Sequence, residues 1–340
     1  QDITVTDDES PSITTAADQT QTADAGSCEA AVTVSSPATG DNCGVASILN
    51  DYNGTSDASD TYPVGTTTVS WTVTDNSGNS STATQDITVT DDESPSITAA
   101  VDQTQTADAG SCDAVVIVSG PSSSDNCGVS TVVNDYNNTS DASDTYPVGT
   151  TTVTWTVTDN SGNSSTDTQD ITVTDDESPS ITASADQTQT ADAGSCDAAV
   201  TVSGPSTSDN CGVAEVVNDY NGTSDASDTY PVGTTTVTWT VTDNSGNSST
   251  ATQDITVTDN EAPSVTSSVD QTQTADAGSC DAAVTVAAPS SSDNCGVSTV
   301  VNDYNGTSDA SDTYPVGTTT ITWTVTDNSG NSSTATQDIT

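Results

Sequence analysis

The sequence predicts an all-β protein made of tandem β-sandwich repeats, and three observations lead to this prediction. One block of sequence recurs every 84 residues, beginning at Gln1, Gln85, Gln169 and Gln253. Within each block, apolar residues alternate with hydroxyl residues along short segments, which is typical of strands that bury one face. No segment shows the 3.6-residue periodicity of an amphipathic helix.

Four segments of the first repeat carry the alternation and are expected to be strands. Thr68–Thr74 places Val69, Trp71 and Val73 on one face and hydroxyl residues on the other. Residues 85–89 alternate in the same way. Further strands are expected at 45–49 and at 28–34, the latter with these residues facing the core: Cys28, Ala30, Val32 and Val34.

Turn signals separate these segments and set the fold type. They are Asp24-Ala25-Gly26, Pro37 to Asp41, Asn53-Gly54, Pro63-Val64-Gly65 and Asn76-Ser77-Gly78-Asn79. About seven short strands in one repeat predict a Greek-key sandwich of immunoglobulin or fibronectin III shape. Ala and Val dominate its core, so we expect it to need an additional constraint.

The charge of the chain excludes several functions. There are 50 Asp and Glu residues and no Lys, Arg or His, which gives a net charge of −50. Nucleic-acid binding and docking on anionic lipid both require cationic side chains, so we exclude them. No apolar run approaches the roughly 18 residues of a membrane span, so we expect no membrane insertion in this segment.

The period also predicts the domain organisation. Residues 337–340 repeat the opening of the block, so we interpret the chain as a segment of a longer array. Residues 1–8 are then the last strand of a preceding repeat. The repeats are expected at 9–92, 93–176, 177–260 and 261–340, the last of them cut in its final strand.

Three motifs together resemble the HYR (hyalin repeat) domain. They are Asp-Asn-Cys-Gly at 41–44, Tyr-Pro-Val-Gly-Thr-Thr-Thr-Val at 62–69 and Trp-Thr-Val-Thr-Asp-Asn-Ser-Gly-Asn at 71–79. All three recur in the same order in the later repeats, so the resemblance covers the whole chain. Further copies of the first motif begin at Asp125, Asp209 and Asp293.

The resemblance implies an immunoglobulin-like, extracellular domain with an adhesive or spacing role and no catalysis. Near-identical tandem copies are more similar to the bacterial surface proteins of the family than to its animal members. Family members often carry a further Cys-Pro early in the domain and another Cys near the last strand. This chain has Thr15 and Ala83 at those places, with Ala99 and Asp167, Ala183 and Ala251, and Ser267 and Ala335 in the later repeats.

The eight cysteines come two to a repeat, always 15 residues apart. Even numbers at a fixed spacing in a chain without His favour disulfides over metal ligation, and hence an oxidising compartment. We favour pairing within each repeat; the alternative is a bridge between neighbouring repeats or neighbouring chains. The candidate pairs are Cys28 and Cys43, Cys112 and Cys127, Cys196 and Cys211, and Cys280 and Cys295.

Acidic residues gather where one repeat passes into the next. In an immunoglobulin-like topology the turn between the last two strands lies at the entry end of its domain, where it should meet these residues. With no cationic side chain available, oxygen ligands in such groups suit Ca²⁺. The expected ligands are Asp7, Asp8, Glu9, Asp75 and Asn79; Asp91, Asp92, Glu93, Asp159 and Asn163; Asp175, Asp176, Glu177, Asp243 and Asn247; and Asp259, Glu261, Asp327 and Asn331.

Other interpretations of the acidic residues stay open. The junctions could be solvated linkers beside a tight hairpin turn at 76–79. Residues 51–60 also offer alternating oxygens, but their spacing is not that of an EF-hand, and we prefer a flexible polar loop there. Asp41 and Asn42 either cap a turn beside the cysteine or supply a ligand.

These observations favour a structural role over a binding or catalytic one. We expect a stalk or filament segment of a giant extracellular surface protein, in contact with neighbouring repeats and with a cell-surface or matrix partner. A glycan- or protein-binding module is the alternative, with a glycan as ligand or lateral self-association of arrays. Such a module needs an exposed aromatic residue, and we expect one Tyr of each repeat to lie in the core. Without His or Lys, acid–base catalysis is not expected.

Overall fold

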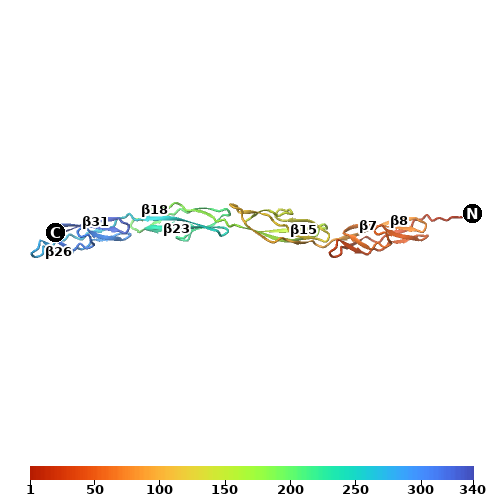
Figure 1. The fold of residues 1–340 in the computed structure, drawn as a ribbon, viewed down its shortest axis with the longest axis horizontal. Coiled ribbons are helices and arrows are strands. Elements are labelled where there is room, and N and C mark those ends of the chain that lie inside the picture. The colour runs from red at the N-terminus through yellow and green to blue at the C-terminus, as the bar shows by residue number, and fades with distance from the viewer. The chain divides into compact units, whose positions relative to one another are not determined.

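The computed structural model describes residues 1–340 and confirms the all-β prediction, since every regular element is a strand. The chain divides into two compact units, Gln1–Asp175 and Asp176–Thr340, and each unit holds two repeats. Figure 1 shows the strands following one another along the chain, with β7 (Gly65–Asp75) and β8 (Ser80–Thr90) side by side in the first repeat.

The first repeat has eight strands, close to the expected seven. The expected strands at 68–74, 85–89 and 45–49 lie within β7, β8 and β5. The strand expected at 28–34 is observed as the shorter β3. The remaining strands are β1 (Ser12–Thr14), β2 (Gln19–Thr22), β3 (Glu29–Val32), β4 (Ala38–Gly40), β5 (Val45–Asn50) and β6 (Asp60–Pro63).

A four-stranded sheet forms one face of the repeat, in the order β2-β8-β7-β5. The pairs β8–β7 and β7–β5 are antiparallel, whereas β2 runs parallel to β8. The opposite face consists of two antiparallel pairs, β3 with β6 and β1 with β4. Successive side chains along β7 therefore point alternately into the space between the two faces and into solvent.

The core lies between the two faces and follows the predicted alternation. Val69, Trp71 and Val73 of β7 are fully buried, and the first two pack against residues of β3 and β6. Tyr62 is also fully buried and stacks on the half-buried Tyr52 with ring centroids 4.3 Å apart. One Tyr of each repeat therefore belongs to the core, as expected.

The buried tyrosine is held by a hydrogen bond as well as by packing. The Tyr62 hydroxyl donates to the carbonyl of Ala58 at 2.6 Å. Burial, together with the charge of neighbouring acidic groups, raises the pKa of Tyr62 to about 12. The hydroxyl therefore stays protonated and bonded at any ordinary pH.

The later repeats have the same order of strands, with one exception. The fourth repeat has only an isolated bridge between Gln271 and Ile339 where the other three have a strand such as β2. The later strands are β9 (Ser96–Thr98), β10 (Gln103–Thr106), β11 (Asp113–Val116), β12 (Ser122–Ser124), β13 (Val129–Asn134), β14 (Asp144–Pro147), β15 (Gly149–Asp159), β16 (Ser164–Thr174), β17 (Ser180–Thr182), β18 (Gln187–Thr190), β19 (Asp197–Val200), β20 (Ser206–Ser208), β21 (Val213–Asn218), β22 (Asp228–Pro231), β23 (Gly233–Asp243), β24 (Ser248–Thr258), β25 (Ser264–Thr266), β26 (Asp281–Val284), β27 (Ser290–Ser292), β28 (Val297–Asn302), β29 (Asp312–Pro315), β30 (Thr319–Asp327) and β31 (Ser332–Ile339).

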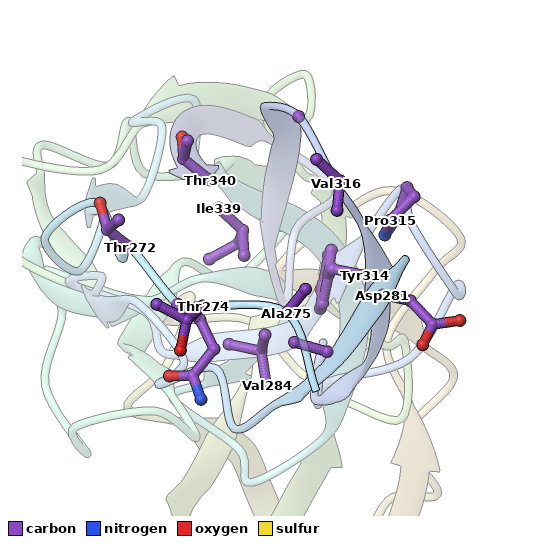
Figure 2. Close-up of a pocket in the computed structure, with 13 residues that line it drawn as sticks. Thr272, Thr274, Ala275, Asp281, Val284, Tyr314, Pro315, Val316, Ile339 and Thr340 are labelled. Atoms are coloured by element: carbon purple, nitrogen blue, oxygen red, sulfur yellow. The ribbon is translucent and has the colours of Figure 1, made fainter. Parts of the chain in front are cut away.

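An apolar pocket of about 340 Å³ opens in the fourth repeat beside Val284, Tyr314 and Ile339 (Figure 2). In the first repeat the counterparts of these residues pack against Val89 of β8. The counterpart of Val89 in the fourth repeat is position 341, one residue beyond Thr340. The pocket therefore marks the place of a core valine and is not a site shared by the repeats.

The opening residues differ in structure from the later copies of the same sequence. Residues 1–11 form no strand, and Ile3 and Val5 are 87% and 91% exposed. The same sequence at 85–90 belongs to β8, which pairs with β2 and β7. The interpretation of residues 1–8 as the last strand of a preceding repeat stays a prediction.

The loop at 51–60 is an ordered network of hydrogen bonds. The buried Asn50 donates its amide to the Asn53 side chain and to the Thr55 carbonyl, both at 2.8 Å. Asn53 in turn donates to the carbonyl of Asp57 at 3.0 Å. Since these polar atoms satisfy one another, we interpret the loop as a structural connection between β5 and β6.

The two positions where family members often carry a further pair of cysteines lie next to each other. In the second repeat the backbone amide of Ala99 donates to Asp167 at 2.7 Å. In the first repeat Thr15 donates to the carbonyl of Thr84, the neighbour of Ala83, at 3.1 Å. At these two positions the chain is therefore joined by hydrogen bonds and not by a disulfide.

Candidate functional site

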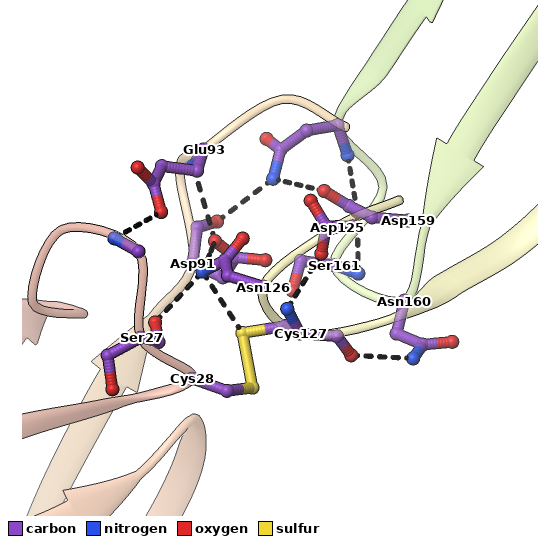
Figure 3. Close-up of a disulfide and its surroundings, with 12 residues drawn as sticks. Ser27, Cys28, Asp91, Glu93, Asp125, Asn126, Cys127, Asp159, Asn160 and Ser161 are labelled. Atoms are coloured by element: carbon purple, nitrogen blue, oxygen red, sulfur yellow. Dashed lines mark hydrogen bonds between the residues drawn. A yellow bond between two sulfur atoms is a disulfide. The ribbon is translucent and has the colours of Figure 1, made fainter. Parts of the chain in front are cut away.

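Three aspartates converge at the entry end of the first, second and fourth repeats. In the second repeat they are Asp91 of the linker, Asp125 of the β12–β13 loop and Asp159 at the end of β15 (Figure 3). Their carboxylate oxygens all lie within 4.8 Å of one another. We call such a trio an Asp cluster; its copies within the two units are Asp7, Asp41 and Asp75, and Asp259, Asp293 and Asp327.

The aspartate at the end of the long strand is held by the hairpin turn that follows it. Asp159 accepts hydrogen bonds on Oδ1 from the backbone amides of Ser161, Gly162 and Asn163, at 2.7–2.9 Å. The Asn163 amide donates to its other oxygen at 2.9 Å. Burial raises the pKa of Asp159, but these hydrogen bonds outweigh it and lower the pKa below its ordinary value. The carboxylate is therefore negative at neutral pH.

Of the other two aspartates, one caps a turn and the other has an oxygen without a donor. Asp125 Oδ2 accepts from the backbone amide of Cys127 at 2.8 Å, which caps the turn before the cysteine. Asp91 is only 8% exposed, and its Oδ2 has no hydrogen-bond partner. A buried carboxylate oxygen without a donor is costly unless a cation neutralises it.

The junction in the second unit collects more oxygens of this kind. Asp259 Oδ2, Asp293 Oδ1 and Asn294 Oδ1 are all buried and have no hydrogen-bond partner. A hollow of about 320 Å³ adjoins Asp259 and Asn294. Because the chain has no Lys, Arg or His, no side chain can supply the missing positive charge. Several hard oxygens facing one another suit a divalent cation.

The structure brings together only some of the expected ligands. In the first, second and fourth repeats, one aspartate of the linker and one at the end of the long strand belong to an Asp cluster. These residues are Asp7, Asp75, Asp91, Asp159, Asp259 and Asp327. Asp175 ends the first unit, whereas Asp209 and Asp243 belong to the second. In the sequence, these three residues occupy the positions equivalent to Asp91, Asp125 and Asp159.

The remaining expected ligands have other places. The asparagines donate their amide hydrogens to the strand-end aspartate and so position it; they are Asn79, Asn163, Asn247 and Asn331. Asp8, Asp92 and Asp176 are exposed and belong to no Asp cluster. Glu9 accepts from Asn42, and Glu93 and Glu261 accept from backbone amides of the preceding repeat. The loop aspartates Asp41, Asp125 and Asp293 complete the clusters. The sequence had left two roles open for Asp41, a turn cap or a ligand. Asp41 and its copies cap the turn by accepting from the amide of the following cysteine.

The disulfides join neighbouring repeats. Cys28 is bonded to Cys127, and Cys196 to Cys295, each pair 99 residues apart with Cα atoms 4.8 Å apart. Pairing within each repeat, as of Cys28 with Cys43, is therefore wrong, and the alternative of a bridge between neighbouring repeats is confirmed. Cys28 is also exposed and does not face the core as expected.

The length of the sheet explains this pairing. The carbonyl of Cys28 accepts from the amide of Val64, just before β7 begins. The carbonyl of Cys43 accepts from Asn76, just after β7 ends, at 3.0 Å. β7 has eleven residues, so at 3.3 Å per residue the two cysteines lie roughly 35 Å apart. A cysteine equivalent to Cys43, such as Cys127, therefore lies near the cysteine of the preceding repeat and far from the other cysteine of its own repeat.

Two hydrogen bonds accompany each junction disulfide. Asn126 donates to the carbonyl of Ser27 at 2.8 Å, and the amide of Gly26 donates to Glu93 at 2.9 Å (Figure 3). The second unit repeats them: Asn294 donates to the carbonyl of Ser195 at 2.6 Å, and Gly194 donates to Glu261 at 2.9 Å. The turn that carries the first cysteine is thus bound at three points.

Two cysteines are free and exposed, Cys43 and Cys280, whereas Cys112 and Cys211 are disulfide-bonded. A hydrogen bond with Asp7 raises the pKa of the Cys43 thiol, and the charges of Asp7, Asp41 and Asp75 act in the same direction. The raised pKa of the thiol is thus partly an effect of the negative potential of the nearby Asp cluster.

None of the elements is a helix with the length and hydropathy of a membrane span.

Curated proteins similar to this chain are hyalins of sea urchins. Hyalin of Strongylocentrotus purpuratus is 31% identical over 319 residues, which are 92% of this chain and 26% of that protein. Hyalin of Lytechinus variegatus is 32% identical over 310 residues, which are 88% of this chain and 56% of that protein. The chain therefore spans between about a quarter and about half of the length of these relatives.

Solved structures of cadherin ectodomains align with the chain at low similarity. Extracellular cadherin domains 3–6 of protocadherin gamma B2 are 14% identical, with 97% of this chain and 99% of that chain covered and a TM-score of 0.31. The human desmocollin-1 ectodomain is 12% identical, with 97% and 79% covered and a TM-score of 0.29. The family model of the HYR domain matches residues 6–89, 90–173, 174–257 and 258–340, and the chain belongs to the HYR domain family.

Proposed function

We propose that the chain is a structural and adhesive segment of a long extracellular surface protein, in which each junction is clamped by a disulfide and stiffened by Ca²⁺. The observation that carries the proposal is the Asp cluster, with its buried oxygens and no cationic side chain to oppose them. The disulfides support an oxidising compartment outside the cell. The partners would be neighbouring repeats and a cell-surface or matrix component.

The chemistry of the donors favours Ca²⁺ over other metals. The Asp clusters offer carboxylate oxygens and neither imidazole nor thiolate, which zinc sites commonly contain. Ca²⁺ accepts six to eight oxygens in flexible geometry, so three carboxylates and several waters could complete its shell. Bound Ca²⁺ would also relieve the mutual repulsion of three carboxylates that lie within 4.8 Å.

The position of the Asp cluster suggests what the cation would do mechanically. β8 ends at Thr90, and the next residue, Asp91, belongs to the cluster of the second repeat. A cation held by Asp91, Asp125 and Asp159 would therefore fasten the end of the first repeat to the body of the second. The disulfide fastens the same two repeats at another point. Two separate attachments restrict hinge motion more than either one alone.

The alternative of a glycan-binding module lacks the aromatic platform that it needs. Tyr62 is buried, and Tyr52 stacks on it while its hydroxyl donates to the Thr61 carbonyl at 2.6 Å. The Trp of each repeat is likewise fully buried. We therefore keep the structural and adhesive role as the proposed function.

Calorimetric titration of the full chain with CaCl₂ tests the proposal. The period predicts close to one Ca²⁺ per repeat, and saturation at 100 times the Kd should stabilise each site by about 2.7 kcal/mol. The variant Asp91→Asn should lose one site. The matched control Asp92→Asn removes the same charge at an exposed neighbour outside the cluster and should bind like the wild type.

Small-angle scattering tests the mechanical part of the proposal. With Ca²⁺ the profile should be that of an extended particle, and a chelator should shift it towards a flexible chain. Absence of Ca²⁺ binding, or equal losses in Asp91→Asn and Asp92→Asn, would refute the metal site. A scattering profile that does not change on chelation would leave the disulfide as the only clamp.

A further inference from the structure

The junction disulfides provide a covalent path along the chain that is much shorter than the backbone. In the first unit one bond joins Cys28 to Cys127, although 99 residues separate them in sequence (Figure 3). The bond between Cys196 and Cys295 has the same separation in the second unit. Tension that reaches Cys28 can therefore pass to the second repeat without loading the residues between the two bonded cysteines.

The two cysteines of one repeat lie at its opposite ends, and in the second repeat both are disulfide-bonded. Cys112 directly precedes β11, and its carbonyl accepts from the amide of Val148, just before β15 begins, at 3.1 Å. Cys127 follows β12, and its carbonyl accepts from Asn160, just after β15 ends, at 2.9 Å. The eleven residues of β15 thus set the separation of the two cysteines at roughly 35 Å.

The segment between these two cysteines runs along one face of the repeat and is already stretched. Its 15 residues would reach roughly 50 Å when fully extended, and they already span roughly 35 Å. Within the segment β11 pairs antiparallel with β14, and β12 with β9. Because the hydrogen bonds of such ladders lie perpendicular to the strands, tension along the segment loads all bonds of a ladder together. The ladders therefore resist this tension better than they would resist opening from one end.

The central strands of the repeat lie outside this segment. β15 and β16 carry the buried Trp155 and Ile171, and neither strand belongs to the chain between Cys112 and Cys127. Tension that passes from cysteine to cysteine therefore does not pull on β15 and β16 directly. If β11 and β12 detach, the segment becomes taut after lengthening by roughly 15 Å, and the rest of the repeat stays off the path.

We propose that the junction disulfides make this chain a tether of limited extensibility. Tension crosses a junction through its disulfide and crosses a repeat through the segment between its two cysteines. Loaded along its whole backbone, a repeat of 84 residues would lengthen on unfolding from roughly 35 Å to roughly 290 Å. Loaded through 15 residues, it would reach only roughly 50 Å. The maximal extension of a repeat thus falls from about eightfold to about 1.4-fold.

This function depends on pairing between repeats. A bond within a repeat would bridge only the 15 residues between its cysteines and would leave the other residues of the repeat extensible. The observed bond instead closes a loop of 99 residues, which is longer than a repeat. The inference rests on the structural role proposed above but not on Ca²⁺, because a covalent path does not require the cation.

Stretching of single molecules of the oxidised full chain, held by tags at its two ends in optical tweezers, tests the proposal. The double variant Cys28→Ser, Cys127→Ser lacks the first bond, and Ser35→Ala is a matched control at an exposed position. Once the repeats unfold, the double variant should be longer than the wild type by roughly 240 Å. This length corresponds to one period of 84 residues less the spacing of 15. The control should match the wild type.

Three results would overturn the proposal. A gain of roughly 340 Å, the whole loop of 99 residues, would mean that tension follows the backbone of the second repeat and not the segment between its cysteines. A gain of roughly 100 Å would indicate two bonds within repeats, and no gain would mean that the bond carries no tension. The difference should be equal with Ca²⁺ and with a chelator. Failure of Ca²⁺ binding would therefore refute the metal site and leave this inference standing.

Discussion

Loss of the first junction disulfide should destabilise the chain in a way that identifies its partner. The substitutions are Cys28→Ser, Cys127→Ser and both together, with Cys43→Ser as the matched control. Cys28 and Cys127 form one bond, so either substitution alone and the double substitution should cost the same. Cys43 is free and exposed, so its substitution should change the free energy of unfolding by less than about 0.5 kcal/mol.

The size of the loss follows from the loop that the bond closes. The cysteines are 99 residues apart, and in the chain-entropy model closure of a loop of about 100 residues contributes about 4.7 kcal/mol. A bond between cysteines about 15 residues apart would contribute only about 3 kcal/mol. For a unit as long as Gln1–Asp175, about 4.7 kcal/mol corresponds to a fall in Tm of roughly 10–20 °C.

Scanning calorimetry of the four proteins, with and without dithiothreitol, measures the effect. Under oxidising conditions the three variants at Cys28 and Cys127 should share one lowered transition, while Cys43→Ser should match the wild type. In dithiothreitol all differences should vanish, because the bond is then absent from every sample. Equal losses in Cys28→Ser and Cys43→Ser would instead indicate pairing within the repeat, and the structural reasoning would be refuted.

Two further predictions concern the core and the cysteine turn. The pKa of Tyr62 is about 12 in the folded chain and about 10 when unfolded, so its contribution to stability should fall between pH 10 and pH 12, where only the unfolded state loses the proton. Urea midpoints between pH 9 and pH 11.5 should therefore decrease less in Tyr62→Phe than in the wild type. Gly128 has φ 94°, and a Cβ there would lie 3.0 Å from the Asn160 amide. Gly128→Ala should therefore cost about 1–3 kcal/mol in urea unfolding, whereas Gly120→Ala, at a place with open space, should cost less than about 0.5 kcal/mol.

The strands and the core could be predicted because their signals are local. Successive side chains of a strand point to opposite faces, so alternation in Thr68–Thr74 is enough to assign Val69, Trp71 and Val73 to the core. The 84-residue period then carries the assignment through the chain. Pairing partners are not local: nothing in the alternation of residues 85–89 indicates that β8 pairs in parallel with β2.

The Asp cluster could be predicted in part. The linker and the hairpin turn were expected to meet, because an immunoglobulin-like topology places both at the entry end of the repeat. The third member, Asp125, comes from a loop whose path depends on how β12 pairs with β9. The asparagine of the turn was expected to be a ligand, yet Asn163 directs its amide hydrogens to Asp159 and to the Asp91 carbonyl. The spacing of residues in the sequence does not determine which way such a side chain points.

The sequence by itself determined the repeat, the all-β class, most residues of the core and the excess of negative charge, because each depends on composition or on periods of two and 84 residues. The tertiary structure alone decided which cysteines are partners and which third carboxylate completes each cluster. The physical reason is distance: Cys28 and Cys43 lie at opposite ends of a sheet roughly 35 Å long. Cys127 belongs to the next repeat and is 99 residues away in sequence, yet docking of that repeat brings it within bonding distance.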